Sequence, residues 1–173
     1  NERAVIEEFC RKDSRIKYIR HTRNRGLFQT RITGMKYASG EYFAFLDSDD
    51  HISIDYYRLL MNRITDSGAD IVIGDFADEY EDGRIEYYNF DNFRFRDIEL
   101  TGEQVYEAFM RQHGLWFGWH TVWNKIYRKN LWEASRPELE RFSEEHGHLI
   151  MTEDVAFSAA FWMAARKVVN CHN

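Results

Sequence analysis

Apolar positions change their spacing from block to block along this chain, which predicts alternating helices and strands. Residues 2–11, 27–38 and a segment from about residue 54 to 64 carry apolar residues at helical spacing. Short apolar runs between these blocks predict strands over 16–19, 42–46, 70–76 and 167–170. This alternation is typical of an α/β fold, with one sheet flanked by helices.

Turn and capping signals organise the second half of the chain. Asp82-Gly83 predicts a tight turn, so residues 85–90 should pair back on the preceding strand as a hairpin. Thr101 and Gln104 form the pattern of a capping box at a helix start. Residues 120–127 read as a further strand, and Thr152 can N-cap a final helix. We expect one domain over 1–173, because no linker or repeat interrupts it.

A cluster of acidic side chains follows the apolar run 42–46. Three carboxylates, Asp47, Asp49 and Asp50, come directly after this predicted strand. Ligands in open α/β sheets sit beyond the carboxyl ends of the strands, which is where this cluster falls. Oxygen-rich clusters suit Mg²⁺ or Mn²⁺ shared with a substrate phosphate. A metal and phosphate site is therefore one interpretation, and a solvated turn that caps the next helix is the other.

Two other metal or phosphate chemistries can be weighed at this cluster. An EF-hand loop that began at Asp47 would need Gly where Ile52 stands and Glu where Arg58 stands, so it is excluded. An aspartyl-phosphate phosphohydrolase also places Asp-x-Asp after an apolar strand, and Asp47 would then be its nucleophile. That alternative remains open at this point, although His51 stands where Thr or Val is expected.

Three ordered motifs carry a family resemblance. They are the run from Asn24 through Gly34 and Gly40-Glu41-Tyr42 to Asp50, then Trp123-Asn124-Lys125-Ile126-Tyr127-Arg128, then Thr152-Glu153-Asp154. Together they resemble the family 2 glycosyltransferases of GT-A fold, over nearly the whole chain. Ile32 departs from the family, which usually has Asn there.

The resemblance implies a GT-A fold, Rossmann-like, with a mixed and mostly parallel sheet flanked by helices. It also implies an incomplete N-terminus, because the family opens with a strand, a helix and a second strand that would precede Asn1. We therefore expect a fragment of a longer enzyme. The implied reaction is inverting transfer of a sugar from a nucleotide-diphosphate sugar, and the resemblance favours a UDP-sugar. The implied cofactor is Mn²⁺ or Mg²⁺.

Roles for individual residues follow from the resemblance. It places Asp49 on the metal and assigns Arg31, Asp47, Ser48 and Asp49 to the nucleotide sugar. It makes Asp154 the catalytic base. As a base, Asp154 should face the acidic cluster and keep one carboxylate oxygen free for the acceptor proton.

A further set of residues has two possible roles each. They could contact the diphosphate or the acceptor, or they could only brace the site: Glu153, Asn124, Lys125, Trp123 and His120. The aromatic residues around His120 could form an acceptor wall or belong to the core: Trp116, Trp119, Trp123 and Tyr127.

Composition narrows the partners. The 173 residues are 44% hydrophobic with a net charge of −6, which argues against a general nucleic-acid binder. Two distant cysteines, Cys10 and Cys171, favour a reducing compartment, so we expect a cytoplasmic protein. No apolar stretch reaches the roughly 20 residues that span a bilayer. Any association with the inner face of the membrane would lie outside this chain.

The sequence thus favours a metal-dependent glycosyltransferase that acts on a saccharide or glycolipid acceptor in surface polysaccharide or glycolipid synthesis. The alternatives are the phosphohydrolase and a nucleotide- or sugar-binding module without catalysis.

Overall fold

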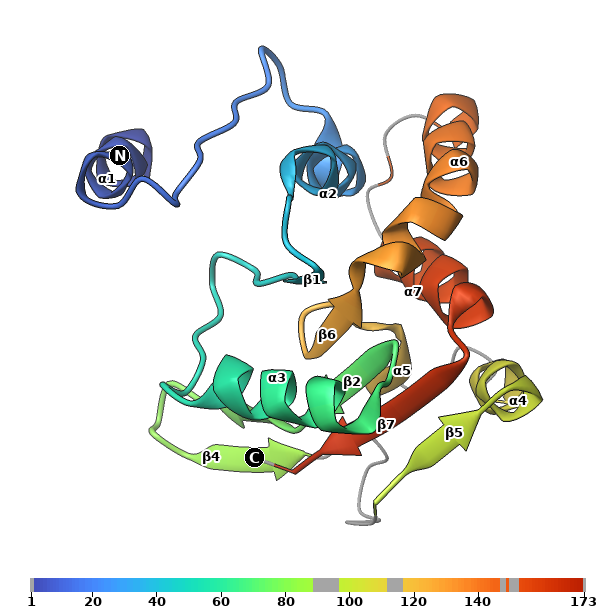
Figure 1. The fold of residues 1–173 in the computed structure, drawn as a ribbon. Coiled ribbons are helices and arrows are strands. Elements are labelled where there is room, and N and C mark those ends of the chain that lie inside the picture. Colours follow the sequence, from blue (N-terminus) through green and yellow to red (C-terminus); the bar gives the residue numbers. More distant parts are fainter. Residues whose placement is uncertain (1, 89–96, 112–116, 147–148, 150–152, 173) are drawn as a thin grey trace.

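A five-stranded sheet forms the centre of the computed structural model, which describes residues 2–88, 97–111, 117–146, 149 and 153–172 (Figure 1). In spatial order its strands are β1 (Tyr42–Ala44), β6 (Lys125–Arg128), β2 (Ile71–Gly74), β7 (Lys167–Cys171) and β5 (Glu99–Thr101). The expected mixed α/β architecture is confirmed.

The pairing of these strands differs from the expectation in one respect. Among the described strands, the β2–β7 pair is parallel, whereas β1–β6, β6–β2 and β7–β5 are antiparallel. Strands β1, β2 and β7 share one direction, but β6 lies between β1 and β2 and runs the opposite way. The expected mostly parallel pairing is therefore wrong, because a late strand is inserted between two early ones.

Helices cover both faces of the sheet because its strands alternate their side chains between two cores. Ile71 and Ile73 of β2 pack into the larger core, whereas Val72 packs into the smaller one. Helix α3 (Tyr56–Ser67) covers the smaller core with Leu60 and Ile64. The larger core is covered by four helices: α2 (Gly26–Tyr37), α4 (Glu103–Arg111), α6 (Lys129–His146) and α7 (Glu153–Ala164).

Two short elements complete the described helices. Helix α1 (Glu2–Lys12) contains no buried residue and lies apart from the sheet in Figure 1. Helix α5 (Phe117–His120) leads into β6. No helix in the described part of the chain is both long enough and apolar enough to cross a membrane.

The structure corrects three of the predicted elements. Residues 16–19 form no strand, since they find no pairing partner among the described strands. The helix expected from about residue 54 begins at Tyr56 and leaves Ile54 fully exposed. Of residues 120–127, His120 ends helix α5, residues 121–124 form a turn, and only residues 125–127 lie in strand β6. The Thr152 cap lies outside the described residues.

Strand β1 is shorter than its apolar run. Its pairing with β6 ends where Ala44 opposes Ile126, and Lys125, the first residue of β6, pairs with β2 on the other side. Phe45 and Leu46 therefore leave the sheet, and the acidic cluster follows on an irregular segment beyond the edge of the pairing.

The predicted hairpin is confirmed, but it stands outside the main sheet. Strand β3 (Phe76–Glu79) pairs with β4 (Ile85–Tyr88) as a separate two-stranded sheet. Gly83 adopts a φ of 82° in the connecting turn, a conformation that favours glycine. The Gln104 side chain accepts a hydrogen bond from the Thr101 backbone N–H at 3.2 Å, as the capping pattern predicted.

Gly74, the last residue of β2, provides a test of the packing between the sheet and α3. A Cβ added at Gly74 would lie 2.5 Å from the Tyr56 hydroxyl oxygen and 2.9 Å from its ring carbon Cζ. Gly74→Ala should therefore displace the buried Tyr56 ring and lower the free energy of unfolding by about 1–3 kcal/mol. Urea denaturation measures this change.

Gly34→Ala is the matched control. Gly34 lies within α2, and a Cβ there would meet nothing within 4 Å. That substitution should raise the free energy of unfolding by about 0.5–1 kcal/mol, because alanine favours a helix. Equal effects of the two substitutions would contradict the packing argument.

Candidate active site

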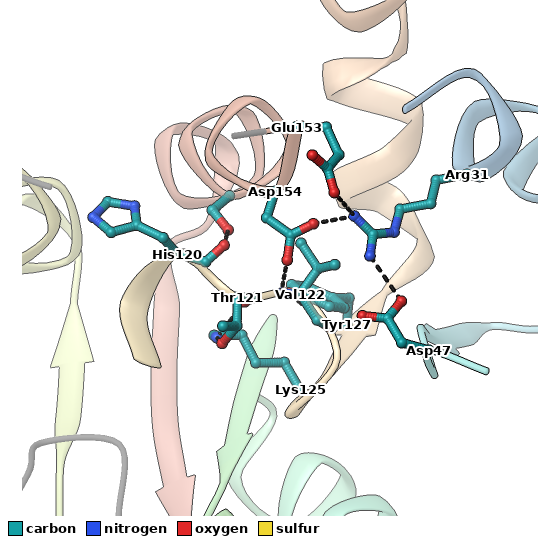
Figure 2. Close-up of polar contacts among 10 residues, drawn as sticks. Arg31, Asp47, His120, Thr121, Val122, Lys125, Tyr127, Glu153 and Asp154 are labelled. Atoms are coloured by element: carbon teal, nitrogen blue, oxygen red, sulfur yellow. Dashed lines mark hydrogen bonds and ion pairs between the residues drawn. The ribbon is translucent and has the colours of Figure 1, made fainter. Parts of the chain in front are cut away.

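A buried arginine joins the two acidic motifs, although more than half of the chain separates them. The Arg31 guanidinium lies 2.9 Å from Asp47 through Nη2 and 3.4 Å from Glu153 through Nη1. Its Nη1 also donates to Oδ1 of Asp154 (Figure 2). The Arg31 side chain is only 5% exposed, so the cation sits among three carboxylates and almost out of water.

Three elements bring these side chains together. Arg31 projects from α2, Asp47 follows β1, and both Glu153 and Asp154 lie in the first turn of α7. Acidic side chains are favourable at a helix N-terminus, which carries partial positive charge. Arg31 therefore adds to a placement that the helix already favours. The expected position of Asp154 near the acidic cluster is consistent with this geometry.

Asp154 has a partner on each oxygen. Its Oδ1 accepts from Arg31, and its Oδ2 accepts from the Val122 backbone N–H at 3.4 Å. The expectation of one free carboxylate oxygen is therefore wrong for the conformation described here. Burial raises the pKa of the Asp154 carboxyl, and the charge of Arg31 limits the rise.

Lys125 lies on the far side of the Val122 segment and is fully buried. Its Nζ donates to the Gly118 carbonyl at 2.7 Å, the Thr121 carbonyl at 2.6 Å and the Asn124 Oδ1 at 2.6 Å. Burial lowers the pKa of the Lys125 ammonium to about 7, and the charge of Asp154 limits the fall. These contacts fold residues 118–125 around the ammonium.

Asn124 belongs to the same hydrogen-bonded group around Lys125, which we call the brace and which comprises residues 118–125. It is fully buried, and its Oδ1 accepts from the Thr121 hydroxyl at 2.9 Å as well as from Lys125. Between the two roles that the sequence left open, burial favours bracing for both Asn124 and Lys125. The brace fixes the backbone of the segment that presents the Val122 N–H to Asp154.

His120 and two of the aromatic residues turn into the interior. The His120 ring points away from Arg31 in Figure 2, and it packs 5.2 Å from the Phe109 ring. Burial lowers the pKa of His120, and the charge of Lys125 adds to the fall. Trp119 packs 4.7 Å from Trp162, so it belongs to the core.

Tyr127 is also part of the core, because its fully buried ring stacks 5.0 Å from Phe43. Trp123 is only partly buried and lines a cavity together with Asp49. Trp116 lies outside the described residues.

The acidic segment itself is open. Ser48, Asp49 and Asp50 are exposed, and Asp47 is half-buried against Arg31. Burial raises the pKa of Asp50, and the charges of Asp47 and Asp49 add to the rise. Among the described residues, no group of three or more His, Cys, Asp or Glu side chains converges as metal ligands.

Sequence reasoning missed two features of this site. The first is the Val122 N–H, because a backbone donor leaves no trace in the residue type. The second is the number of carboxylates that share Arg31. Acidic residues were identified at both motifs, but only the packing of α2 against α7 shows that one cation serves both.

Comparisons with known proteins agree on one family. Residues 1–129 match the family model described as Glycosyl transferase family 2. The chain is 32% identical over 171 residues to the putative glycosyltransferase EpsH of Bacillus subtilis (strain 168), covering 95% of this chain and 44% of that protein. It is 30% identical over 142 residues to Glycosyltransferase GlyA of Streptococcus pneumoniae serotype 4, covering 82% of this chain and 20% of that protein.

A solved structure supports the fold. S. aureus TarS 1-349 superposes with a TM-score of 0.65 at 19% identity, covering 98% of this chain and 45% of that chain. At this identity the likeness shows the fold alone, and the expected GT-A fold is confirmed. The chain spans less than half the length of each of these three proteins.

Arg31→Met tests the shared cation. It keeps much of the side-chain volume but leaves three carboxylates without their partner, so the free energy of unfolding near pH 7.5 should fall by about 3–5 kcal/mol. The pKa of Asp154 should rise further, because Arg31 limits it now. A carboxyl whose pKa is higher in the folded state lowers the free energy of unfolding at pH values above that pKa. It has no effect at pH values below the pKa of the unfolded state. The deficit relative to wild type should therefore shrink as pH falls toward about 4.

The control for Arg31→Met is Lys36→Met on the same helix. Lys36 pairs with Glu140 at 2.7 Å but is 41% exposed, so its loss should cost no more than about 1 kcal/mol. Chemical denaturation of both variants across this pH range is the measurement. A deficit for Arg31→Met that is independent of pH would show that the carboxylates are not held by its charge.

Lys125→Met tests the buried brace. Burying the Lys125 ammonium destabilises the folded state, and this cost is fully present below the folded-state pKa of about 7. The cost disappears as pH rises toward the unfolded-state pKa of about 10.4, because the folded protein then holds a neutral amine. The wild-type protein should therefore gain stability between about pH 7 and 9 from this group, and Lys125→Met should lack that gain. Lys129→Met removes a half-buried lysine that donates to the Ala38 carbonyl, and it should keep the wild-type pH profile. Identical profiles for all three proteins would refute the prediction.

Proposed function

This chain belongs to glycosyl transferase family 2, and on that premise we propose that it transfers a sugar from a nucleotide-diphosphate sugar to a hydroxyl acceptor, with inversion at the anomeric carbon. The donor that the resemblance favours is a UDP-sugar. The observation that carries the proposal is the meeting of Asp47 and Asp154 at one buried Arg31. This contact sets a candidate base beside a candidate nucleotide-binding segment.

In this proposal Asp154 removes the proton from the acceptor hydroxyl. A general base works best when its pKa lies nearer the working pH than that of a free carboxylate. Burial raises the pKa of Asp154, which moves it in the useful direction. The Val122 N–H holds one oxygen and so orients the other toward Arg31.

Arg31 has a second role in the proposed reaction. Its guanidinium now occupies the Asp154 oxygen that the acceptor proton would need. A planar guanidinium binds phosphate as readily as carboxylate. We propose that an arriving donor diphosphate or nucleotide draws Arg31 away from Asp154, so that the base becomes free only when the donor is bound.

The donor set at the acidic segment fits a divalent cation that is only partly held by the protein. Asp49, with Asp47 and Ser48 beside it, offers exposed oxygen ligands, whereas a complete protein cage is absent among the described residues. Mg²⁺-type ions usually keep waters and take phosphate oxygens from the substrate. We propose Mn²⁺ or Mg²⁺ on Asp49, where it would neutralise the charge of the leaving diphosphate.

The remaining candidates divide by exposure. Trp123 faces a cavity and is proposed to contact the acceptor. Glu153 pairs with Arg31 and is proposed to tune its charge. Asn124, Lys125 and His120 are buried, so their proposed role is to shape residues 118–125 rather than to touch substrate.

The acceptor class and the setting are also proposals. We propose a saccharide or glycolipid acceptor in polysaccharide or glycolipid synthesis, in the cytoplasm and at the inner face of a membrane. In support, a relative that is 26% identical over 177 residues is named Cholesterol galactosyltransferase, from Borreliella burgdorferi. Family membership leaves the phosphohydrolase alternative without support. A binding module without catalysis remains the competing function, and turnover decides between the two.

Asp154→Asn in the full-length protein is the deciding experiment. Asparagine keeps the size but lacks the basicity, so turnover of UDP-sugars should fall by about 10²–10⁴-fold. Donor affinity, measured by calorimetry, should not fall, because the base acts on the acceptor and Arg31 is held less tightly by a neutral asparagine. EDTA should abolish turnover by the wild-type protein, and added Mn²⁺ should restore it.

Glu153→Gln is the matched control, since it changes the neighbouring carboxylate on the same helix turn. It should lower turnover by less than about tenfold. Full turnover by Asp154→Asn would remove Asp154 as the base. Saturable UDP-sugar binding without turnover by the wild-type protein would favour the binding module.

A further inference from the structure

A large cavity lies beside the acidic segment and extends under the β3–β4 hairpin. Its volume is about 1300 Å³. Sites that enclose one small molecule measure about 300–1,000 Å³, so this cavity has room for more than one sugar ring. Its lining includes Leu46 and residues 49–53 of the acidic segment, and residues of the hairpin with Asp75 before it.

Aromatic rings make up much of the cavity wall. Phe76 stacks on Tyr88 with ring centroids 5.3 Å apart and meets Trp123 edge-on at 5.1 Å. These contacts hold the rings in fixed orientations before any ligand arrives. Tyr87 is 77% exposed, and its ring also belongs to the cavity lining. The aromatic lining residues are Tyr56, Phe76, Tyr80, Tyr87, Tyr88 and Trp123.

The charge of the lining has one sign. Its carboxylates are Asp49, Asp50, Asp75, Asp78, Glu79 and Glu81, and the described part of the lining contains no lysine or arginine. Among these described lining residues, His51 is the one that can become cationic, and it lies 3.4 Å from Glu79. Arg84 in the hairpin is not a lining residue, but its guanidinium packs 3.9 Å over the ring of Tyr80, which is one, and it pairs with Glu86.

The cavity adjoins the proposed active site at two points. Asp49 lines it and follows Asp47, the partner of Arg31, by two residues. Trp123 lines it and directly follows Val122, the donor to Asp154. A ligand in the cavity therefore rests against the immediate neighbours of both proposed catalytic motifs.

We infer that this cavity binds the acceptor, and that the acceptor is a saccharide chain without phosphate, carboxylate or sulfate groups. The inference rests on the proposed function. Aromatic faces stack on the apolar faces of sugar rings, and carboxylates accept hydrogen bonds from sugar hydroxyls. An anionic sugar would face six carboxylates, five of them outside the proposed metal site, and the described lining holds no lysine or arginine to offset them. Such like-charge contact discriminates between ligands. The hairpin thus discriminates between neutral and anionic acceptors.

The test compares sugars that differ only in charge. Galactotriose and trigalacturonate share their ring stereochemistry and differ in the oxidation of C6. Binding to the full-length protein without donor is followed by tryptophan fluorescence and ligand-observed NMR, and neutral trisaccharides of glucose and N-acetylglucosamine complete the panel. At low salt at least one neutral trisaccharide should bind, and trigalacturonate should bind at least tenfold more weakly. The gap should narrow at high salt.

Variants locate the binding in the cavity. Tyr87→Ala should weaken the neutral trisaccharide by about 2–10-fold through loss of a stacking ring. The double variant Asp78→Asn/Glu81→Gln removes two exposed charges and should reduce the discrimination against trigalacturonate severalfold. Tyr106→Ala, on the exposed surface of α4 and outside the cavity, is the matched control and should change neither quantity.

Three outcomes would each overturn the inference. They are trigalacturonate binding as tightly as the neutral sugars, no binding by any neutral member of the panel, and equal effects of Tyr87→Ala and Tyr106→Ala. Failure here is distinguishable from failure of the proposed function, because these measurements need no donor and no turnover. If the protein transfers sugar but the cavity substitutions leave trisaccharide binding unchanged, the proposed function stands and the proposed acceptor site is wrong.

Discussion

The ion pairs of Arg31 are the interaction on which the candidate site depends. One guanidinium, almost removed from water, is shared by Asp47 after β1 and by Glu153 and Asp154 at the start of α7. Removing a guanidinium and, in part, three carboxylates from water is costly, and the cost is offset only where each charge has a close partner of opposite sign. The packing of α2 against α7 is therefore also an electrostatic requirement. Any ligand that competes for this arginine changes the charge balance of the whole site.

Lys125 is a second buried cation that supports the site of Arg31. Lys125 holds the backbone of residues 118–124 through oxygen acceptors, and that backbone presents the Val122 N–H to Asp154. Asp154 is thus fixed at both oxygens, at one by the Arg31 side chain and at the other by the segment that Lys125 holds (Figure 2). Because the ammonium of Lys125 is fully buried, it acts on Asp154 through the field and through the segment, without direct contact.

The sequence predicted the parts of this molecule that depend on local pattern. Helix α2, the β3–β4 hairpin and the strand β7 follow from apolar spacing and turn residues, and the acidic motifs follow from the residue types. What escaped prediction depends on contacts between distant segments. Residues 16–19 have the composition of a strand but find no partner among the described strands. Strand β6 lies between β1 and β2, which no local signal encodes. The contact between Asp154 and Arg31 belongs to the same class, because only packing decides which carboxylate meets which cation.

The insertion of β6 has a consequence for how the chain acquires its structure. Every pairing in the main sheet joins segments that several other helices or strands separate along the sequence, and the only described pair of adjacent strands, β3–β4, stands apart from that sheet. Loop-closure entropy must be overcome before such distant pairings form, so topologies of this kind fold slowly. During synthesis, one edge of β2 has no partner until β6 has emerged from the ribosome, and the other has none until β7 has emerged. Nascent copies would therefore expose an unpaired strand edge, and with it a risk of aggregation, until Lys167–Cys171 emerges.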